Sequence, residues 1–318
     1  MSRRQSHARH SGRSVESQAA AGQPNRLNNF DYLRLFLALE VVGLHTFDIS
    51  NPGFFRSPIP PVPAFLCLSG FLIPGSFSAS RSWKHFAWKR ILRVYPALLV
   101  SLVLVTVVFG VGNLPVTLLT YLTAGMLGMA SGNRALWSLM IEEVCYAWHA
   151  VSQLRGFWNA RLCALLLGTS FAASCAPHLP GRVFLGLFAC FFAGNLIYFM
   201  RDKLSRIPLW IWLVALAGLM AGCAVYWEGP VYQLLSVPAS FMAVMAALRL
   251  PQIRFRMPDL SYGTYVYHLP LLAALRSRGF QGFELLGVGV VATLAFSAAS
   301  WYAIESQALK FKDWRPRR

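Results

Sequence analysis

Arg34 and His45 lie eleven residues apart in the first apolar stretch of the sequence, FDYLRLFLALEVVGLH. In a helix this spacing is about three turns, so both side chains share one face, separated by a rise of roughly 16 Å. A guanidinium binds phosphate, and an imidazole exchanges a proton near neutral pH. The spacing therefore favours a long ligand with an anionic head on Arg34 and a reactive end near His45. The alternative is a snorkelling arginine and a histidine with a packing role.

Glu142 is a candidate partner for His45. It lies near the outer end of a later apolar stretch that opens with LWSLMIEEVCYAWH, at a depth similar to that of His45. A carboxylate beside an imidazole raises its basicity and fixes its tautomer. We therefore predict that Glu142 lies beside His45 and orients it.

Two further pairs of residues have spacings that suit ligand binding. Arg90 and Arg93 are three residues apart in WKRILRVYP, so they share one helical face and make a candidate phosphate clamp. Ordinary positive charge at the cytoplasmic surface is the alternative. Ser69 and Gly70 interrupt the apolar run LCLSGFLIPGSF, where a ligand could approach the backbone closely. Helix packing by small residues is the alternative for this pair.

Composition decides the class of protein that must hold these residues. The chain has 318 residues, of which 56% are hydrophobic and 13% charged, about half the roughly 25% charge of a soluble domain. The net charge of +17 is interleaved with long apolar runs, which excludes a nucleic-acid binder and favours loops at a membrane surface. The six cysteines form no C-x-x-C pair, and we predict no metal site.

The apolar runs predict an all-α, polytopic membrane protein whose partner is the lipid bilayer. A helix needs roughly 20 residues to cross a bilayer core of about 30 Å. About ten stretches have this character, namely residues 30–49, 61–78, 94–112, 136–154, 161–177, 183–200, 208–227, 230–248, 260–276 and 283–304. A shorter stretch, 114–130, is predicted to be re-entrant or interfacial. This arrangement leaves most Lys and Arg residues inside, so both termini are predicted to be cytoplasmic.

The sequence divides into one membrane domain and two tails. Residues 1–29 contain five arginines and one acid, and we predict a disordered, basic cytoplasmic tail rather than a secretory signal. A mitochondrial transit peptide is the lesser alternative. Residues 30–306 form the predicted membrane domain, and residues 307–318 form a basic cytoplasmic C-terminal tail.

The order of these elements resembles the acyltransferase 3 family of integral membrane O-acyltransferases. An R-x10-H helix is followed by SGFL, by R-x-x-R with Tyr-Pro, by LWSL-x-x-E and by SYG-x-Y-x-x-H. These elements run from Arg34 to His268, and Glu305 then closes the last stretch. The resemblance covers nearly all of the chain beyond the N-terminal tail. One departure is Trp148–His149, where the family usually has Phe-Pro or a similar pair.

The resemblance implies transfer of an acyl group, usually acetyl, from a coenzyme A thioester to a hydroxyl of a carbohydrate or related acceptor. It implies a protein of the bacterial inner membrane. His45 and Glu142 are then the expected catalytic residues, with Glu142 orienting His45 or helping to bind the acceptor. Residues expected to bind the acyl-CoA donor are Arg34, Arg90, Arg93, Ser69 and Gly70. Residues expected to support the site are Asp31, His268 and Glu305.

The sequence leaves two questions open, the catalytic route and the class of function. Direct transfer and an acyl-histidine intermediate are equally compatible with the sequence. Ten spans with buried ionisable residues are also compatible with a transporter or flippase of a glycan or small solute, although no inverted repeat is visible.

Overall fold

A computed structural model describes residues 28–50, 56–110, 114–123, 133–176, 178–226, 230–255 and 257–313 of the chain. Residues 1–27, most of the predicted N-terminal tail, and residues 314–318, the end of the predicted C-terminal tail, lie outside the described residues. The described residues contain helices and no strands, so the predicted all-α fold is confirmed for them.

The α-helices are α2 (Asn28–Ser50), α3 (Pro61–Ser78), α4 (Trp83–Phe109), α5 (Leu114–Leu122), α6 (Trp137–Leu154), α7 (Ala160–Ser174), α8 (Arg182–Leu204), α9 (Leu209–Val225), α10 (Pro230–Arg249), α11 (Ser261–Arg276), α12 (Gly282–Ser300) and α13 (Ser306–Ala308). Two 3₁₀ segments, η2 (Arg134–Leu136) and η4 (Leu309–Asp313), and one π-helical segment, η3 (Trp301–Glu305), complete the fold.

Local signals explain where several helices begin and end. The Ser82 hydroxyl accepts a hydrogen bond from the backbone N–H of His85 at 3.2 Å and caps the start of α4. The same helix ends before Gly110, whose φ of +80° suits a residue without a Cβ. Asn159 caps α7 through Leu162 in the same way.

Five described segments are long and apolar enough to cross a membrane. They are α3, α4, α8, residues Val231–Arg249 of α10, and the stretch Gly282–Asp313 that begins with α12. Each of the ten predicted stretches contains a helix, but several helices are shorter or carry more charge, so the count of ten spans stays a prediction. Helix α5 has nine residues and a length of about 14 Å, roughly half of a bilayer core.

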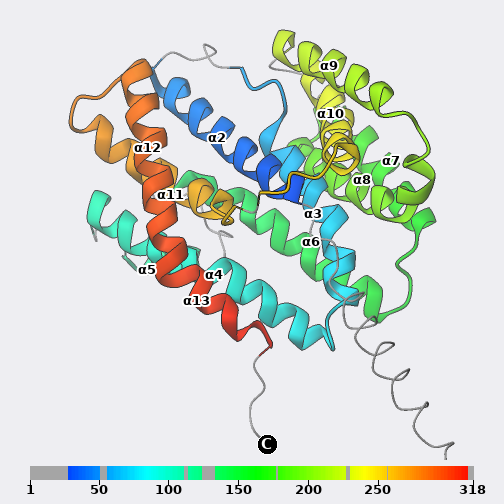
Figure 1. The fold of residues 1–318 in the computed structure, drawn as a ribbon, viewed down its shortest axis with the longest axis horizontal. Helices are drawn as coiled ribbons and strands as arrows, with labels where there is room; N and C mark the ends of the chain where they lie inside the picture. The colour runs from blue at the N-terminus through cyan, green and yellow to red at the C-terminus, as the bar shows by residue number, and fades with distance from the viewer. Residues whose placement is uncertain are drawn as a thin grey trace, which may run out of the picture.

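Helix α3 lies at the centre of the packing. Figure 1 shows α7 to α10 gathered on one side, α4, α5, α11 and α12 on the other, and α2, α3 and α6 between them. Helices α3 and α8 cross at Gly70 and Gly194, where a Cβ on either glycine would overlap backbone atoms of the other helix. The two backbones are therefore in direct contact, and Phe71, Phe191 and Leu68 fill the surrounding core.

The C-terminal segment docks on the start of α4. Trp88 Nε1 donates a hydrogen bond to the carbonyl oxygen of Phe311 at 3.0 Å, and His85 Nε2 lies 2.9 Å from that of Lys312. The first part of the predicted C-terminal tail is therefore a helical segment, η4, packed against the bundle.

Candidate active site

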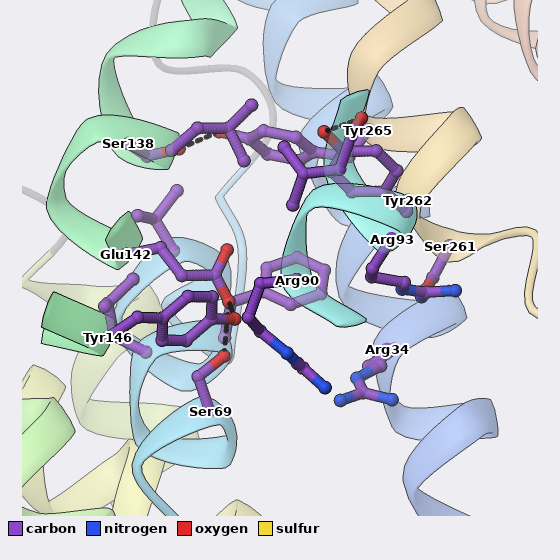
Figure 2. A pocket seen from close by; sticks show the side chains of 15 residues that line it. Arg34, Ser69, Arg90, Arg93, Ser138, Glu142, Tyr146, Ser261, Tyr262 and Tyr265 are labelled. Atoms are coloured by element: carbon purple, nitrogen blue, oxygen red, sulfur yellow. Dashed lines mark hydrogen bonds between the residues drawn. The ribbon is translucent and has the colours of Figure 1, made fainter. Parts of the chain in front are cut away.

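A pocket opens where α2, α3, α4, α6 and α11 meet. Its polar lining residues are Arg34, Arg90, Arg93, Ser69, Glu142, Tyr146, Ser138, Ser261, Tyr262 and Tyr265. Figure 2 shows the three arginines approaching the pocket from two helices, and the hydroxyl and carboxyl groups facing them. Apolar side chains such as Val62, Phe65 and Leu139 complete the wall.

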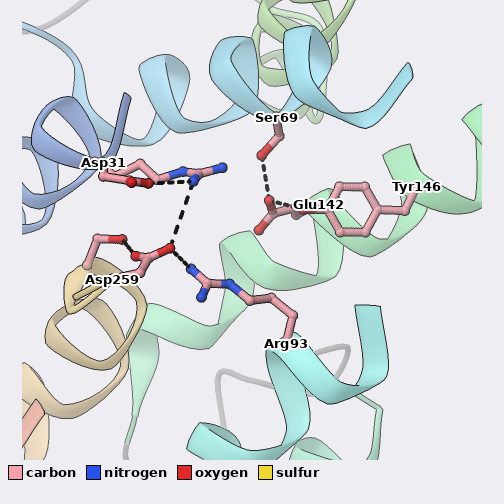
Figure 3. A network of polar contacts seen from close by, with 8 residues as sticks. Asp31, Ser69, Arg93, Glu142, Tyr146 and Asp259 are labelled. Carbon is pink, nitrogen blue, oxygen red and sulfur yellow. Dashed lines mark hydrogen bonds and ion pairs between the residues drawn. The ribbon is translucent and has the colours of Figure 1, made fainter. Parts of the chain in front are cut away.

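The arginine end of the pocket is held by an ion-pair network (Figure 3). Arg93 Nη2 lies 2.5 Å from Oδ2 of Asp259, and Arg34 Nη1 lies 3.9 Å from the same oxygen. Arg34 also lies 3.7 Å from a carboxylate oxygen of Asp31. Arg90 also lies at this end of the pocket, so three guanidiniums face the two carboxylates. The arginine end therefore keeps an excess of positive charge.

Asp259 belongs to the loop between α10 and α11. Burial by itself would raise the pKa of this carboxyl, but Arg93, Arg34 and the Ser261 hydroxyl outweigh burial and lower the pKa from 3.8 to about 2. Ser261 donates a hydrogen bond to Asp259 at 2.7 Å. Asp259 is therefore a permanent anion at neutral pH, and it fixes two of the arginines.

Arg90 is the arginine of this group without an acidic partner among the described residues. Its Nη2 donates a hydrogen bond to the Ser76 hydroxyl at 3.1 Å. Its guanidinium lies 5.7 Å from the ring centres of Phe86 and Tyr146, while its Nε is buried and makes no hydrogen bond. A buried N–H without a partner is costly, so an anion that entered here would relieve that cost.

Glu142 faces the pocket from α6. Its Oε1 accepts hydrogen bonds from the Ser69 hydroxyl at 2.6 Å and from the Tyr146 hydroxyl one helical turn further along. Figure 3 shows this cluster across the pocket from the arginines. A second hydroxyl pair, Ser138 and Tyr265, lies 2.6 Å apart on the same wall.

His45 lies behind this wall, paired with another histidine. Its Nδ1 is 3.1 Å from Nε2 of His268 and 3.0 Å from the carbonyl oxygen of Val41. Neither imidazole lines the pocket, but the Tyr265 side chain does, and its carbonyl oxygen lies 2.7 Å from Nδ1 of His268. Tyr265 therefore lies between the pocket and the histidine pair and contacts both.

The predicted contact between Glu142 and His45 is wrong. Glu142 binds Ser69 and Tyr146, and His45 pairs with His268 instead. The physical reason is that residue counting gives the depth of a side chain but not its direction around the bundle. Helix α6 turns Glu142 toward α3, whereas α2 turns His45 toward α11.

The other predicted residues fall into two groups. Arg34, Arg90, Arg93 and Ser69 line one pocket, so the structure brings these four together. Gly70 does not line it, because its Cα packs against the backbone of Phe191 in α8. The small-residue packing alternative therefore describes its contacts.

Asp31 and Glu305 occupy supporting places outside the lining. Asp31 pairs with Arg34. Glu305 is buried in the π-helical segment η3 and accepts hydrogen bonds from Ser300 at 2.9 Å and Tyr267 at 3.3 Å. π-Helical turns are frequent at functional sites, and this one points Glu305 into the bundle.

Sequence reasoning missed several residues of the site, and three of them lie close to its motifs. Tyr146 lies four residues after Glu142, a spacing that puts both on one helical face. Asp259 precedes the SYG element by two residues, and Tyr265 is the second tyrosine within that element. A search for polar side chains near each motif, in addition to those inside it, would have found all three.

The fold and the pocket define a helical membrane protein with a pocket inside its bundle that three arginines line. Residues 27–303 match the acyltransferase domain of the acyltransferase 3 family. The chain belongs to this family, so the predicted resemblance is confirmed and the protein is an acyltransferase. The family match does not support the transporter or flippase alternative.

Two curated proteins are similar over nearly their whole length. Nodulation protein 10 of Rhizobium leguminosarum bv. viciae is 29% identical over 349 residues, which cover 90% of this chain and 94% of that protein. An O-acetyl transferase of Shigella phage Sf6 is 24% identical over 347 residues, which cover 90% of this chain and 97% of that protein. No solved structure matches the chain.

Proposed function

We propose that this acyltransferase moves an acetyl group from acetyl-CoA to a hydroxyl of a cell-surface or lipid-linked carbohydrate. The family supports acyl transfer, and the name of the phage relative supports an O-acetyl product. The acceptor class follows from the family resemblance. The observation that carries the proposal is the pocket lined by Arg34, Arg90 and Arg93.

In this proposal the arginine end of the pocket binds the phosphates of coenzyme A. Guanidiniums form paired hydrogen bonds with phosphate oxygens. Arg90 has a buried Nε without a hydrogen-bond partner and makes no salt bridge among the described residues, so we assign it as the main phosphate ligand. Asp259 holds Arg93 and Arg34 in place beside it.

The pantetheine arm would then extend along the wall that carries Glu142. This arm contains amide N–H groups, and a carboxylate is a strong acceptor for them. Ser69 and Tyr146 both donate to Glu142 and keep it oriented. We therefore assign Glu142 to donor binding, in place of the predicted contact with His45.

The chemical step assigned to His45 is removal of a proton from the acceptor hydroxyl. The hydroxyl oxygen attacks the thioester carbon as its proton moves to the imidazole. The carbon–sulfur bond then breaks, and the proton passes to the departing coenzyme A thiolate. Tyr265 stands between the pocket and the histidine pair, so the thioester must pass this side chain to reach His45.

The proposed topology has about ten spans, with both termini on the cytoplasmic side of a bacterial inner membrane. Residues 1–29 and 307–318 are then cytoplasmic tails flanking the membrane domain, residues 30–306. Arg34 lies near the beginning of α2, and Asp259 lies in the loop before α11. Under this topology both face the cytoplasm, where acetyl-CoA is made available, and the acceptor enters from the other side.

The test follows thiol release from acetyl-CoA by the purified protein, with and without a glycan extract of the cell envelope. Wild type should release thiol only with extract, and His45→Ala should abolish the release while still binding acetyl-CoA. His178→Ala, an exposed histidine outside the site, is the matched control and should behave as wild type. Full activity of His45→Ala would overturn the catalytic assignment. Absence of thiol release from folded wild type that also fails to bind acetyl-CoA would overturn the donor assignment.

A further inference from the structure

A chain of hydrogen bonds fixes where the protons of two histidines lie, one of them buried and the other partly buried. His268 is fully buried, and its Nδ1 lies 2.7 Å from the carbonyl oxygen of Tyr265. A carbonyl oxygen can only accept a hydrogen bond, so Nδ1 of His268 carries the proton. In the neutral ring, Nε2 of His268 is then the nitrogen with the lone pair.

The same reasoning extends to His45. Its Nδ1 lies 3.1 Å from Nε2 of His268 and 3.0 Å from the carbonyl oxygen of Val41. Both neighbours are acceptors, so Nδ1 of His45 must be the donor. The lone pair of neutral His45 is therefore on Nε2.

We propose that His268 is a positioning residue that holds His45 in its Nδ1–H tautomer, so that Nε2 of His45 takes the proton of the acceptor hydroxyl. This inference rests on the proposed function, because it needs His45 to act as the base. When the hydroxyl proton reaches Nε2, the ring becomes an imidazolium whose Nδ1–H still donates to His268. The proton then leaves from Nε2 to the thiolate of coenzyme A, and His268 remains neutral throughout.

Hydrogen bonds from other helices and loops support α11 beside His268. Pro270 has no N–H, so the carbonyl oxygen of Val266 loses its usual helical partner. Asn133 donates to that oxygen at 2.8 Å and Ser101 lies 3.4 Å from it. The break in the helix is thus repaired by residues from outside α11, directly beside the histidine.

The arrangement also links the histidine pair to the pocket. Tyr265 presents its side chain to the pocket and its carbonyl oxygen to His268. Its hydroxyl is held by Ser138 at 2.6 Å and by the carbonyl oxygen of Ala135 at 3.0 Å. One residue therefore connects the donor pocket and the orientation of the base.

Three substitutions of His268 separate a tautomer effect from a packing effect. The amide oxygen of His268→Gln can stand where Nε2 stands and accept from His45. The shorter amide of His268→Asn keeps the bond to the Tyr265 carbonyl but cannot reach His45, and His268→Leu keeps neither bond. His149→Leu removes another fully buried histidine, one that lies outside the pocket, and is the control.

We expect His268→Gln to retain acyl transfer, and His268→Asn and His268→Leu to lose about 10- to 100-fold in kcat, part of what a general base contributes. The KM for acetyl-CoA should not change, because the pocket is intact. Nitrogen-15 NMR of histidine-labelled protein should show the Nδ1–H tautomer for His45 in wild type and His268→Gln. The Nε2–H form should increase in the other two variants, because Nδ1–H of His45 loses the acceptor Nε2 of His268 and keeps the Val41 carbonyl oxygen. His149→Leu should match wild type.

The outcomes separate this inference from the proposed function. If His45→Ala is inactive but folded His268→Asn and His268→Leu keep the wild-type kcat, the positioning role is wrong and the base stands. An equal loss in all three His268 variants would indicate packing and would overturn the tautomer argument, as would an Nε2–H tautomer in wild type. If His45→Ala is fully active, the proposed function itself fails.

Discussion

Arg93 and Asp259 join α4 to the loop before α11 through a contact of 2.5 Å between Nη2 and Oδ2. Asp259 is shared with Arg34 of α2, so one carboxylate positions two of the three cations in the pocket. The side chain of Asp259 is only 8% exposed, and a buried ion that loses its partner is strongly destabilising. The geometry of the cation cluster therefore depends on an acid that does not itself line the pocket.

The first prediction concerns this acid and pH. Because the folded pKa of Asp259 is lowered from 3.8 to about 2, its contribution is fully present above about pH 4 and is lost as pH falls toward 2. The shift corresponds to about 2 kcal/mol. Asp259→Asn should therefore lower the melting temperature in detergent at pH 6, and its difference from wild type should shrink between pH 4 and pH 2.

Asp202→Asn is the control for the pH experiment. Asp202 has a side chain that is 93% exposed and pairs only with its neighbour Arg201, so its removal should leave the melting temperature unchanged at every pH. A difference between Asp259→Asn and wild type that is as large at pH 2 as at pH 6 would contradict the assignment of the ion pair.

The second prediction concerns the unpaired cation. Arg90→Gln breaks no salt bridge among the described residues, so the fold should tolerate it. The affinity for coenzyme A should fall about 10- to 100-fold, since a hydrogen bond to a charged group contributes about 1.5–3 kcal/mol. Calorimetric titration with coenzyme A and with its form lacking the 3′-phosphate would show which phosphate Arg90 binds.

Arg201→Gln supplies the matched control for this titration, because Arg201 is about half exposed and lies at the end of α8, away from the pocket. Its dissociation constant should equal that of wild type. The role of Arg90 would be wrong if Arg90→Gln also bound coenzyme A with the wild-type constant.

Sequence patterns predicted the local features of this protein and missed the relations between helices. The apolar runs predicted the helices because burial in lipid acts on each segment separately. Helical periodicity likewise related Arg90 to Arg93, which both line the pocket. The neighbour of Glu142 depends on how α6 is rotated against α3, and no local pattern encodes that rotation.

Asp259 and Gly70 are two residues whose contacts local sequence patterns could not predict. Asp259 lies in a short loop beside several basic residues, where an acid has no periodic pattern to mark it. Gly70 suits both a ligand contact and a helix crossing, and only the backbone of α8 decides between them. The roles of the pocket residues in catalysis stay predictions.

The third prediction concerns the two hydroxyls on Glu142. Ser69→Ala or Tyr146→Phe each leaves the carboxylate with one donor, whereas the double variant leaves it with none. An acceptor left without any donor costs more than one lost hydrogen bond. The fold decrease in kcat/KM of the double variant should therefore exceed the product of the fold decreases of the two single variants. Ser205→Ala, at the end of α8 and outside the pocket lining, is the control. Strictly multiplicative losses would indicate that the two hydroxyls act independently of Glu142.

The fourth prediction concerns the crossing of α3 and α8. A methyl group on Gly70 would overlap the carbonyl oxygen of Phe191, and backbone cannot yield as a flexible side chain can. Gly70→Ala should therefore destabilise the protein by about 1–3 kcal/mol or more, the usual effect of overpacking. Gly75→Ala on the same helix meets only the Tyr198 ring, at 3.8 Å, and should keep the wild-type melting temperature. The fraction of Gly70→Ala that still folds should bind coenzyme A normally, because Gly70 lies outside the pocket lining. A stable Gly70→Ala protein with weakened coenzyme A binding would show instead that this glycine contacts the donor.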